Sequence, residues 1–178
     1  IAEHVGGSET GFVKMMNEYA VKIGMTSTHF TNVTGLYDDN QYTTAADIAL
    51  LVRTALSNTD FSKIFATQAK PWYDEDKTLL LTNANNMFWS YEGTDGGVLG
   101  YFDESVQSIV TSATKNSMRL VCILIDVPAE KVYAESTQLL NYGFDNFRYG
   151  TLVAAGSVPK SVVIGNETVN LVPTADVP

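Results

Sequence analysis

The chain has 178 residues, of which 45% are hydrophobic, so it can bury the core of one ordinary domain, or of one domain with a small appendage. Its net charge of −9 and its 11 scattered basic residues argue against nucleic-acid binding, which needs clustered cations. No apolar run reaches the roughly 18 residues of a membrane-spanning helix. The chain opens Ile-Ala-Glu-His, without Met or a signal-peptide pattern, and we expect it to be part of a longer protein.

The first half is predicted to be helical. Apolar residues recur at helical spacing after Ser8, which is a suitable N-cap, and Gly24 is a suitable terminator of that helix. A long ordered loop rich in Thr, Asn and Asp follows, and Thr43 or Thr44 then caps the next helix. The predicted helices span residues 9–23, 44–57 and 61–67.

The second half has the pattern of β-structure with one further helix. The segment Met118–Val127 is almost continuously apolar, which is typical of a central strand covered on both faces. Cys122 in this segment is predicted to be a buried hydrophobic side chain. Gly165-Asn166 is predicted to form a two-residue hairpin turn between short strands. Strands are predicted at 78–82, 105–114, 118–127, 151–155, 161–164 and 168–172, and a helix at 129–147.

Several short segments occur together in an order that is typical of one family. Residues 16–56, MNEYAVKIGMTSTHFTNVTGLYDDNQYTTAADIALLVRTAL, resemble the helical region of the serine D-alanyl-D-alanine carboxypeptidases. These are the low-molecular-mass penicillin-binding proteins of the bacterial cell wall. Asn83-Ala84-Asn85 with Trp89 resembles the family's Asn-Thr-Asn segment, and Asp95-Gly96 leads into a strand as it does there. The resemblance covers residues 1–147, whereas the tail resembles the family's C-terminal β-domain only in kind.

Catalysis in that family rests on a Ser-x-x-Lys nucleophile, a Ser-x-Asn and a Lys-Thr-Gly on a strand. In the family, the first two motifs precede the position at which this chain begins. At the third, Val98 stands for the lysine and Leu99 for the threonine, whereas Gly100 and Tyr101 are retained and Phe102 stands where threonine is usual. Neither Val nor Leu binds a carboxylate or carries a proton. The resemblance therefore implies the frame of a site without its third motif.

Other patterns that suggest chemistry have simpler interpretations. Ser112–Lys115 and Ser157–Lys160 match Ser-x-x-Lys, but the first runs off a strand into a turn and the second lies in a β-rich tail. His4 and His29 lack further ligands at metal-site spacing, so neither a metal nor another cofactor is predicted. Four aromatic residues either line a groove or pack in the core or at its rim. They are Trp72, Tyr73, Trp89 and Tyr91.

The predicted fold class is α+β: part of a β-lactamase/transpeptidase-like domain, with an antiparallel sheet and flanking helices, followed by the start of a small β-rich domain. The predicted domains are residues 1–147 and 148–178. By the resemblance, a preceding segment would supply edge strands and the nucleophile helix. The apolar surface that this leaves would be covered by that segment, a partner or a swapped chain. The alternative is a chain that repacks into a compact stand-alone domain.

The sequence thus predicts a relative of serine carboxypeptidases that trim peptidoglycan stem peptides and bind β-lactams, outside the bacterial membrane and attached to it through another segment. The chain itself is predicted to be inactive. The alternative is a non-catalytic pseudoenzyme that binds or scaffolds the cell wall. No catalytic residue is assigned. The expected lining of the remnant cleft is Gly96, Gly97, Val98, Leu99, Gly100 and Tyr101, with Trp89 at its rim.

Overall fold

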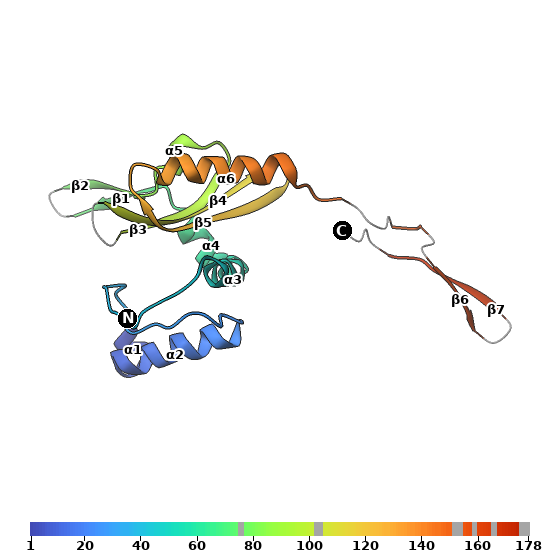
Figure 1. The fold of residues 1–178 in the computed structure, drawn as a ribbon, viewed down its shortest axis with the longest axis horizontal. Coiled ribbons are helices and arrows are strands. Elements are labelled where there is room, and N and C mark those ends of the chain that lie inside the picture. Colours follow the sequence, from blue (N-terminus) through green and yellow to red (C-terminus); the bar gives the residue numbers. More distant parts are fainter. Residues whose placement is uncertain (75–76, 102–104, 151–154, 158–159, 165–166, 175–178) are drawn as a thin grey trace. The chain divides into compact units, whose positions relative to one another are not determined.

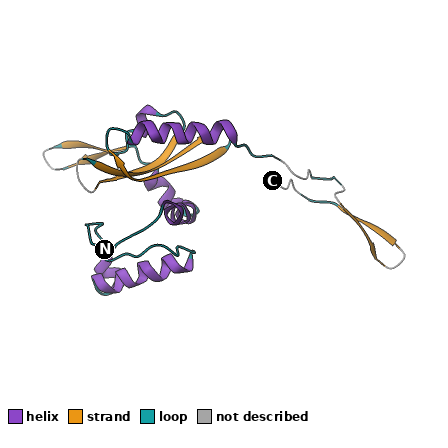
Figure 2. Cartoon of the chain, viewed as in Figure 1, coloured by secondary structure: helices purple, strands orange, loops and turns teal. Residues whose placement is uncertain are grey.

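The computed structural model describes residues 1–74, 77–101, 105–150, 155–157, 160–164 and 167–174 (Figures 1 and 2). The chain divides into two compact units, Ile1–Gly143 and Phe144–Pro178. The helices are α1 (Ala2–Gly6), α2 (Glu9–Lys22), α3 (Ala45–Leu56), α4 (Thr59–Phe65), α5 (Met87–Ser90) and α6 (Val132–Asn146). The strands are β1 (Ala69–Tyr73), β2 (Thr78–Thr82), β3 (Thr94–Tyr101), β4 (Val106–Lys115), β5 (Met118–Pro128), β6 (Lys160–Ile164) and β7 (Glu167–Leu171).

Side-chain caps begin α2 and α3, the two longer helices of the first half. Ser8 Oγ accepts a hydrogen bond from the Gly11 N–H at 2.9 Å at the start of α2, and Gly24 follows that helix with a φ of 90°. Thr44 Oγ1 accepts from the Asp47 N–H at 3.2 Å and begins α3. Both helices confirm the prediction, because each cap supplies an acceptor to a backbone N–H that the helix leaves unpaired. The short α1 and α5 were not predicted.

The loop between α2 and α3 is ordered by hydrogen bonds to buried or half-buried side chains. Asp47 is only 5% exposed, and its Oδ2 accepts from the Ser27 N–H at 2.8 Å and from Thr28 Oγ1 at 2.7 Å. An isolated β-bridge joins His29 to Tyr42 across the loop. The predicted long ordered loop is therefore confirmed.

The sheet of the first unit is antiparallel, with the strand order β3-β4-β5. The prediction that Met118–Val127 is a central strand is wrong in this sheet, where β5 lies at an edge and β4 in the centre. Its apolar sequence has another cause, since helices lie on both faces of the sheet (Figure 1). α6 approaches β5 so closely that a Cβ on Gly143 would lie 2.5 Å from Leu120 Cδ1, and α3 also contacts β5.

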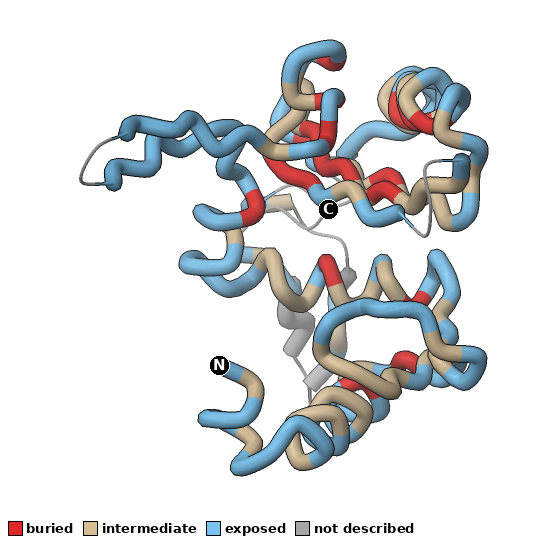
Figure 3. The backbone as a smooth tube through the Cα atoms, turned by 90° about the vertical axis from the view of Figure 1, so that its left-hand side faces the viewer, coloured by how far each residue is buried: buried red, intermediate tan, exposed pale blue. Residues whose placement is uncertain are grey.

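β1 and β2 form a separate antiparallel hairpin, with Trp72 opposite Leu79 and Pro71 opposite Leu80. β2 was predicted, but β1 was not, because Pro71 argues against a strand in the interior of a sheet. Every residue of both strands is exposed, and Figure 3 shows the hairpin projecting from the remainder of the first unit.

The second unit contains the hairpin of β6 and β7, which pair from Lys160↔Leu171 to Ile164↔Glu167. This confirms the predicted strand pair, although the predicted turn residues 165–166 lie outside the described residues. The predicted strand at 151–155 lies almost entirely outside them as well. Among the described helices, none has the length and apolar character needed to cross a membrane.

Candidate functional site

The segment that matches the third motif forms β3, at the opposite edge of the sheet from β5. Val98 pairs with Val110 and Leu99 with Ile109, and a bulge lies between Thr94 and Gly96. Gly96 and Gly97 are buried, whereas the side chains turn outward further along the strand: Val98 is 53% exposed and Tyr101 73%. Phe102 lies outside the described residues. β3 therefore presents an apolar, half-exposed surface at the edge of the sheet.

The two glycines at the start of β3 are required by close packing. A Cβ on Gly96 would lie 2.3 Å from Phe65 Cδ1 and 2.7 Å from Ser112 Oγ. A Cβ on Gly97 would lie 2.3 Å from Asn85 Nδ2 and 2.7 Å from the Val110 carbonyl oxygen. These separations are far below van der Waals contact, so no side chain fits at either position without displacing its neighbours. β3 is thus held tightly just before Val98.

Two asparagines between β2 and α5 fix the position of β3 and of the loop beside it. Asn83 Nδ2 donates to the Gly97 carbonyl oxygen at 3.1 Å. Asn85 is fully buried, and its Nδ2 donates to Thr111 Oγ1 at 2.9 Å and to the Val110 carbonyl at 3.2 Å, while its Oδ1 accepts from the Met87 N–H. Since a buried amide must have its hydrogen bonds satisfied, Asn85 fixes the loop against β4.

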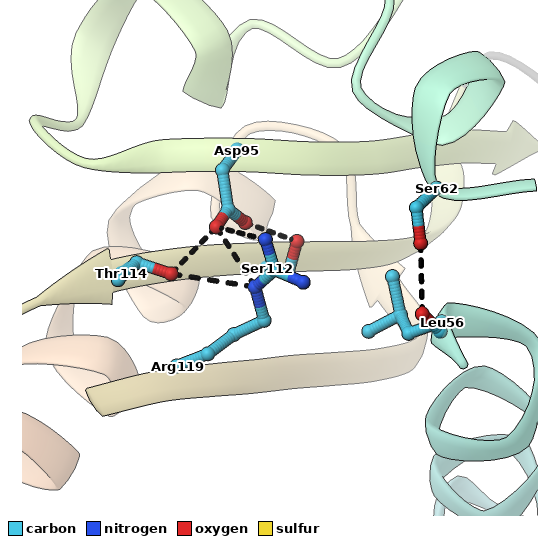
Figure 4. A network of polar contacts seen from close by, with 6 residues as sticks. All are labelled: Leu56, Ser62, Asp95, Ser112, Thr114 and Arg119. Carbon is cyan, nitrogen blue, oxygen red and sulfur yellow. Dashed lines mark hydrogen bonds and ion pairs between the residues drawn. The ribbon is translucent and has the colours of Figure 1, made fainter. Parts of the chain in front are cut away.

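Asp95, within the bulge of β3, is the centre of a polar network (Figure 4). Its carboxylate accepts hydrogen bonds from Ser112 Oγ and Thr114 Oγ1, each at 2.6 Å. Arg119 on β5 donates from Nε to Asp95 Oδ2 at 2.8 Å, and its Nη2 lies 2.7 Å from the same oxygen. The network joins all strands of the sheet through one carboxylate.

The pKa of the Asp95 carboxyl reflects these contacts. Partial burial by itself would raise the pKa, because it disfavours the charged form. The hydrogen bonds from Ser112, Thr114 and Arg119, together with the Arg119 charge, outweigh burial and lower the pKa below its ordinary value. A carboxylate with a lowered pKa is a weak general base. Asp95 therefore fits a structural role better than a proton-transfer role.

Two cations of the sheet, Arg119 and Lys115, contact side chains of the protein itself. Arg119 is paired with Asp95, and Lys115 Nζ lies 4.2 Å from the centre of the Tyr91 ring. Val98 and Leu99 offer neither charge nor hydrogen-bonding side chains. The described part of β3 can therefore contact a ligand through its backbone and through apolar surface, but its side chains at 98 and 99 cannot bind a carboxylate.

The other sequence patterns find structural roles. Ser112, in the first Ser-x-x-Lys match, lies in β4, is fully buried and donates to Asp95, so it is not accessible to a substrate. The second match includes residues outside the described ones. No group of three or more His, Cys, Asp or Glu side chains suited to a metal ion occurs within the described ranges.

The aromatic residues divide between core and surface. Tyr91 is buried and donates to Asn141 Oδ1 at 2.9 Å, whereas Trp89, on α5 next to β3, is 52% exposed. Trp72 and Tyr73 belong to the exposed hairpin. Two surface hollows, of about 460 and 140 Å³, are lined by residues of α1, α2, α3 and the α2–α3 loop, and neither includes a β3 residue. Tyr91 also adjoins β3, because its carbonyl accepts a hydrogen bond from Thr94 Oγ1 at 2.9 Å, so Trp89 is the exposed aromatic of this group next to the strand.

Sequence reasoning missed the residues that support β3. Asn83 and Asn85 were noted only in the segment that resembles the family's Asn-Thr-Asn, Asp95 only as leading into a strand, and Arg119 only as part of the apolar strand at 118–127. One signal was present: Ser112 and Thr114 are two residues apart, so they lie on one face of a predicted strand and offer two hydroxyls to a common acceptor. Which acidic residue accepts hydrogen bonds from these hydroxyls depends on which strands pair, and the alternation of apolar and polar residues does not determine that pairing.

Comparison with known proteins gives consistent matches. The D-alanyl-D-alanine carboxypeptidase family (Peptidase_S11) matches residues 1–129. The D-alanyl-D-alanine carboxypeptidase DacF of Bacillus subtilis is 32% identical over 149 residues, which are 83% of this chain and 38% of DacF. DacC of Escherichia coli is likewise 32% identical, over 83% of this chain and 36% of its own length. The crystal structure of penicillin binding protein 5 from Haemophilus influenzae matches this fold with a TM-score of 0.80 and 30% sequence identity. The match covers 98% of this chain and 52% of that protein's chain. The chain therefore spans about two fifths of these carboxypeptidases and about half of the solved structure.

Proposed function

This chain belongs to the D-alanyl-D-alanine carboxypeptidase family, and from that membership we propose that it retains the family's site frame without peptidase activity of its own. It is a relative of the serine carboxypeptidases with the α+β fold of the penicillin-binding proteins. Its remnant cleft would be lined by residues 96–101 of β3, with Trp89 at the rim. We also propose that the transpeptidase-like domain ends at residue 147 and that the β-rich domain begins at residue 148.

The single observation that supports inactivity is the chemistry of β3 at its exposed positions. Val98 and Leu99 occupy the places where the family has Lys and Thr, and Val98 is half-exposed on a strand whose backbone is firmly held. Neither side chain can bind a carboxylate or move a proton. The proposed location is the bacterial cell envelope, outside the membrane, where the whole protein would meet peptidoglycan stem peptides and β-lactams. A preceding segment or a partner chain would cover the remaining apolar surface.

Intact-mass spectrometry after incubation with benzylpenicillin tests the proposal. A serine nucleophile would open the lactam ring and gain the whole mass of the drug. We expect this chain to keep its mass, because these residues contain no usable nucleophile. The Val98→Lys/Leu99→Thr double variant should keep its mass too, since it restores the strand motif without supplying a nucleophile. Penicillin binding protein 5 from Haemophilus influenzae serves as the positive control. An adduct on the unmodified chain would overturn the proposal. An adduct only on the double variant would place a working nucleophile within the chain.

The retained frame also favours a second function, non-catalytic binding to the cell wall. Val98 and Tyr101 on β3 and Trp89 on α5, which contacts β3, each expose apolar or aromatic surface. Co-sedimentation with purified peptidoglycan would measure binding. Replacing Trp89 and Tyr101 by Ser should weaken binding by about tenfold, which corresponds to about 1.4 kcal/mol. Tyr149→Ser, at an exposed tyrosine of the second unit, is the matched control. Equal loss in both variants, or no binding at all, would exclude this function for the site.

A further inference from the structure

The hairpin of β1 and β2 is an unusually exposed piece of apolar structure. Five of its large apolar side chains are at least half-exposed: Trp72 56%, Tyr73 73%, Leu79 53%, Leu80 65% and Leu81 52%. The described residues place no other strand beside it, since β1 and β2 form a sheet of their own. An isolated two-stranded hairpin is only marginally stable in water, and an exposed apolar surface of this kind marks an interaction site.

The hydrogen-bond pattern of the hairpin shows which backbone groups point outward. Asp74 and Lys77 exchange backbone hydrogen bonds at one end, and the Asn83 N–H donates to the Gln68 carbonyl at the other. In an antiparallel ladder such pairs alternate, so Leu79 and Leu81 bond inward to β1. The backbone N–H and C=O groups of the remaining residues of β2 then face its outer edge. These residues are Thr78, Leu80 and Thr82.

The two edges of the hairpin differ in their capacity to accept another strand. On β1 the outward residues include Pro71, which has no N–H, and the strand also carries Lys70. Proline and lysine are the residues that protect natural sheet edges from pairing. β2, with the sequence Thr-Leu-Leu-Leu-Thr, contains no charge, proline or glycine. Only the β2 edge is therefore unprotected.

We propose that the β2 edge pairs antiparallel with β2 of a second copy of this chain, about a twofold axis at Leu80. The strand sequence reads identically in both directions, so Leu80 lies opposite Leu80 of the other copy, Thr78 opposite Thr82, and Leu79 opposite Leu81. A twofold interface requires such self-complementarity. The outward N–H and C=O groups of Leu80 in the two copies would bond reciprocally, as would those of Thr78 and Thr82.

The same register is compatible with the charges of the chain. It sets Lys77 of one copy opposite Asn83 of the other, so no like charges meet across the pair in spite of the net charge of −9. Leucine side chains meet on both faces of the joined strands and cover part of the surface that a single copy exposes. Because Pro71 blocks the β1 edge, pairing ends at two copies and does not continue into a fibre.

Sedimentation velocity over a wide concentration range tests the pairing. We expect a reversible monomer–dimer equilibrium for the protein. Leu80→Lys and Leu80→Glu should each weaken dimerisation by at least about tenfold, because like charges then face each other at the axis. A mixture of the two variants should recover dimer, since Lys of one chain then meets Glu of the other. Tyr73→Lys, at an outward position of β1, is the matched control and should leave dimerisation unchanged.

The mixing step separates loss of the interface from loss of the hairpin, because two misfolded hairpins would not restore each other. A monomer at every concentration would overturn the proposal. A dimer that withstands both Leu80 variants, or variants that stay monomeric when mixed, would also overturn it. Loss of the dimer in Tyr73→Lys would move the interface to β1 and overturn the assignment to β2.

Discussion

Gly97→Ala is expected to lower the free energy of unfolding by about 3 kcal/mol, at the upper end of the cost of overpacking a core. The new Cβ would fall 2.3 Å from Asn85 Nδ2 and 2.7 Å from the Val110 carbonyl oxygen. Asn85 is fully buried and bonded to Thr111, so it has no free space into which to withdraw. Either β3 separates from β4 or Asn85 loses hydrogen bonds that its burial makes necessary.

Urea denaturation would measure this effect, with Gly100→Ala on the same strand as the control. A Cβ on Gly100 would meet only the Ser108 carbonyl oxygen, at 3.9 Å, which is ordinary contact. Its free energy of unfolding should stay within about 0.5 kcal/mol of the unmodified protein. In an Asn85→Ala background, Gly97→Ala should cost less, because one of the two close contacts is gone. Equal costs for the two glycines would contradict the tight packing of β3.

The contrast between these glycines bears on the proposed function. Close packing at Gly96 and Gly97 constrains the backbone that leads into the site, whereas Val98 and Tyr101 point to solvent. Side chains at these two buried positions would disrupt the packing of β3 against its neighbours. Substitution of the exposed residues is expected to change the stability by no more than about 0.5 kcal/mol. Under the proposed function, stability alone would be enough to retain this strand without the Lys and Thr side chains at positions 98 and 99.

Much of the fold could be predicted from local signals. Ser8, Gly24 and Thr44 mark helix ends because a cap depends on residues within one turn. The strand at Met118–Pro128 was found from its apolar run, but its place at the sheet edge was not, because helices on both faces produce the same pattern as neighbouring strands. β1 was missed since Pro71 is tolerated only at an edge, and edges are a property of the whole sheet.

The site was predictable only in part. The residues of β3 and their departures from the Lys-Thr-Gly pattern are visible in the sequence. The residues that hold β3 are not, because Asn83 and Asp95 act across strand and loop pairings that bring together positions 14 and 24 residues apart. Asparagine near a turn has a common local explanation, which concealed its contact with Gly97.

Asp95→Asn is expected to lower the free energy of unfolding at neutral pH by about 1.5–3 kcal/mol, the range for losing hydrogen bonds to a charged group. The amide keeps the size of the carboxylate, but its NH2 group faces donors, and the charge that pairs with Arg119 is gone. Ser112 is fully buried and would be left with a poorer acceptor. Asp60→Asn is the matched control, because Asp60 pairs with Lys63 on the exposed side of α4. An exposed pair of this kind contributes only about 0–1 kcal/mol.

The pH dependence distinguishes a charged network from simple loss of packing. The pKa of Asp95 is lower in the folded protein than its ordinary value of 3.8, so the folded state favours the ionised form. Its stabilising contribution is therefore complete above that value and is lost as the pH falls through the lower, folded pKa. The difference in stability between the unmodified protein and Asp95→Asn should be constant near neutrality and shrink in this acidic window. A difference that persists unchanged in acid would mean that the Asp95 side chain acts through its shape and not through its charge.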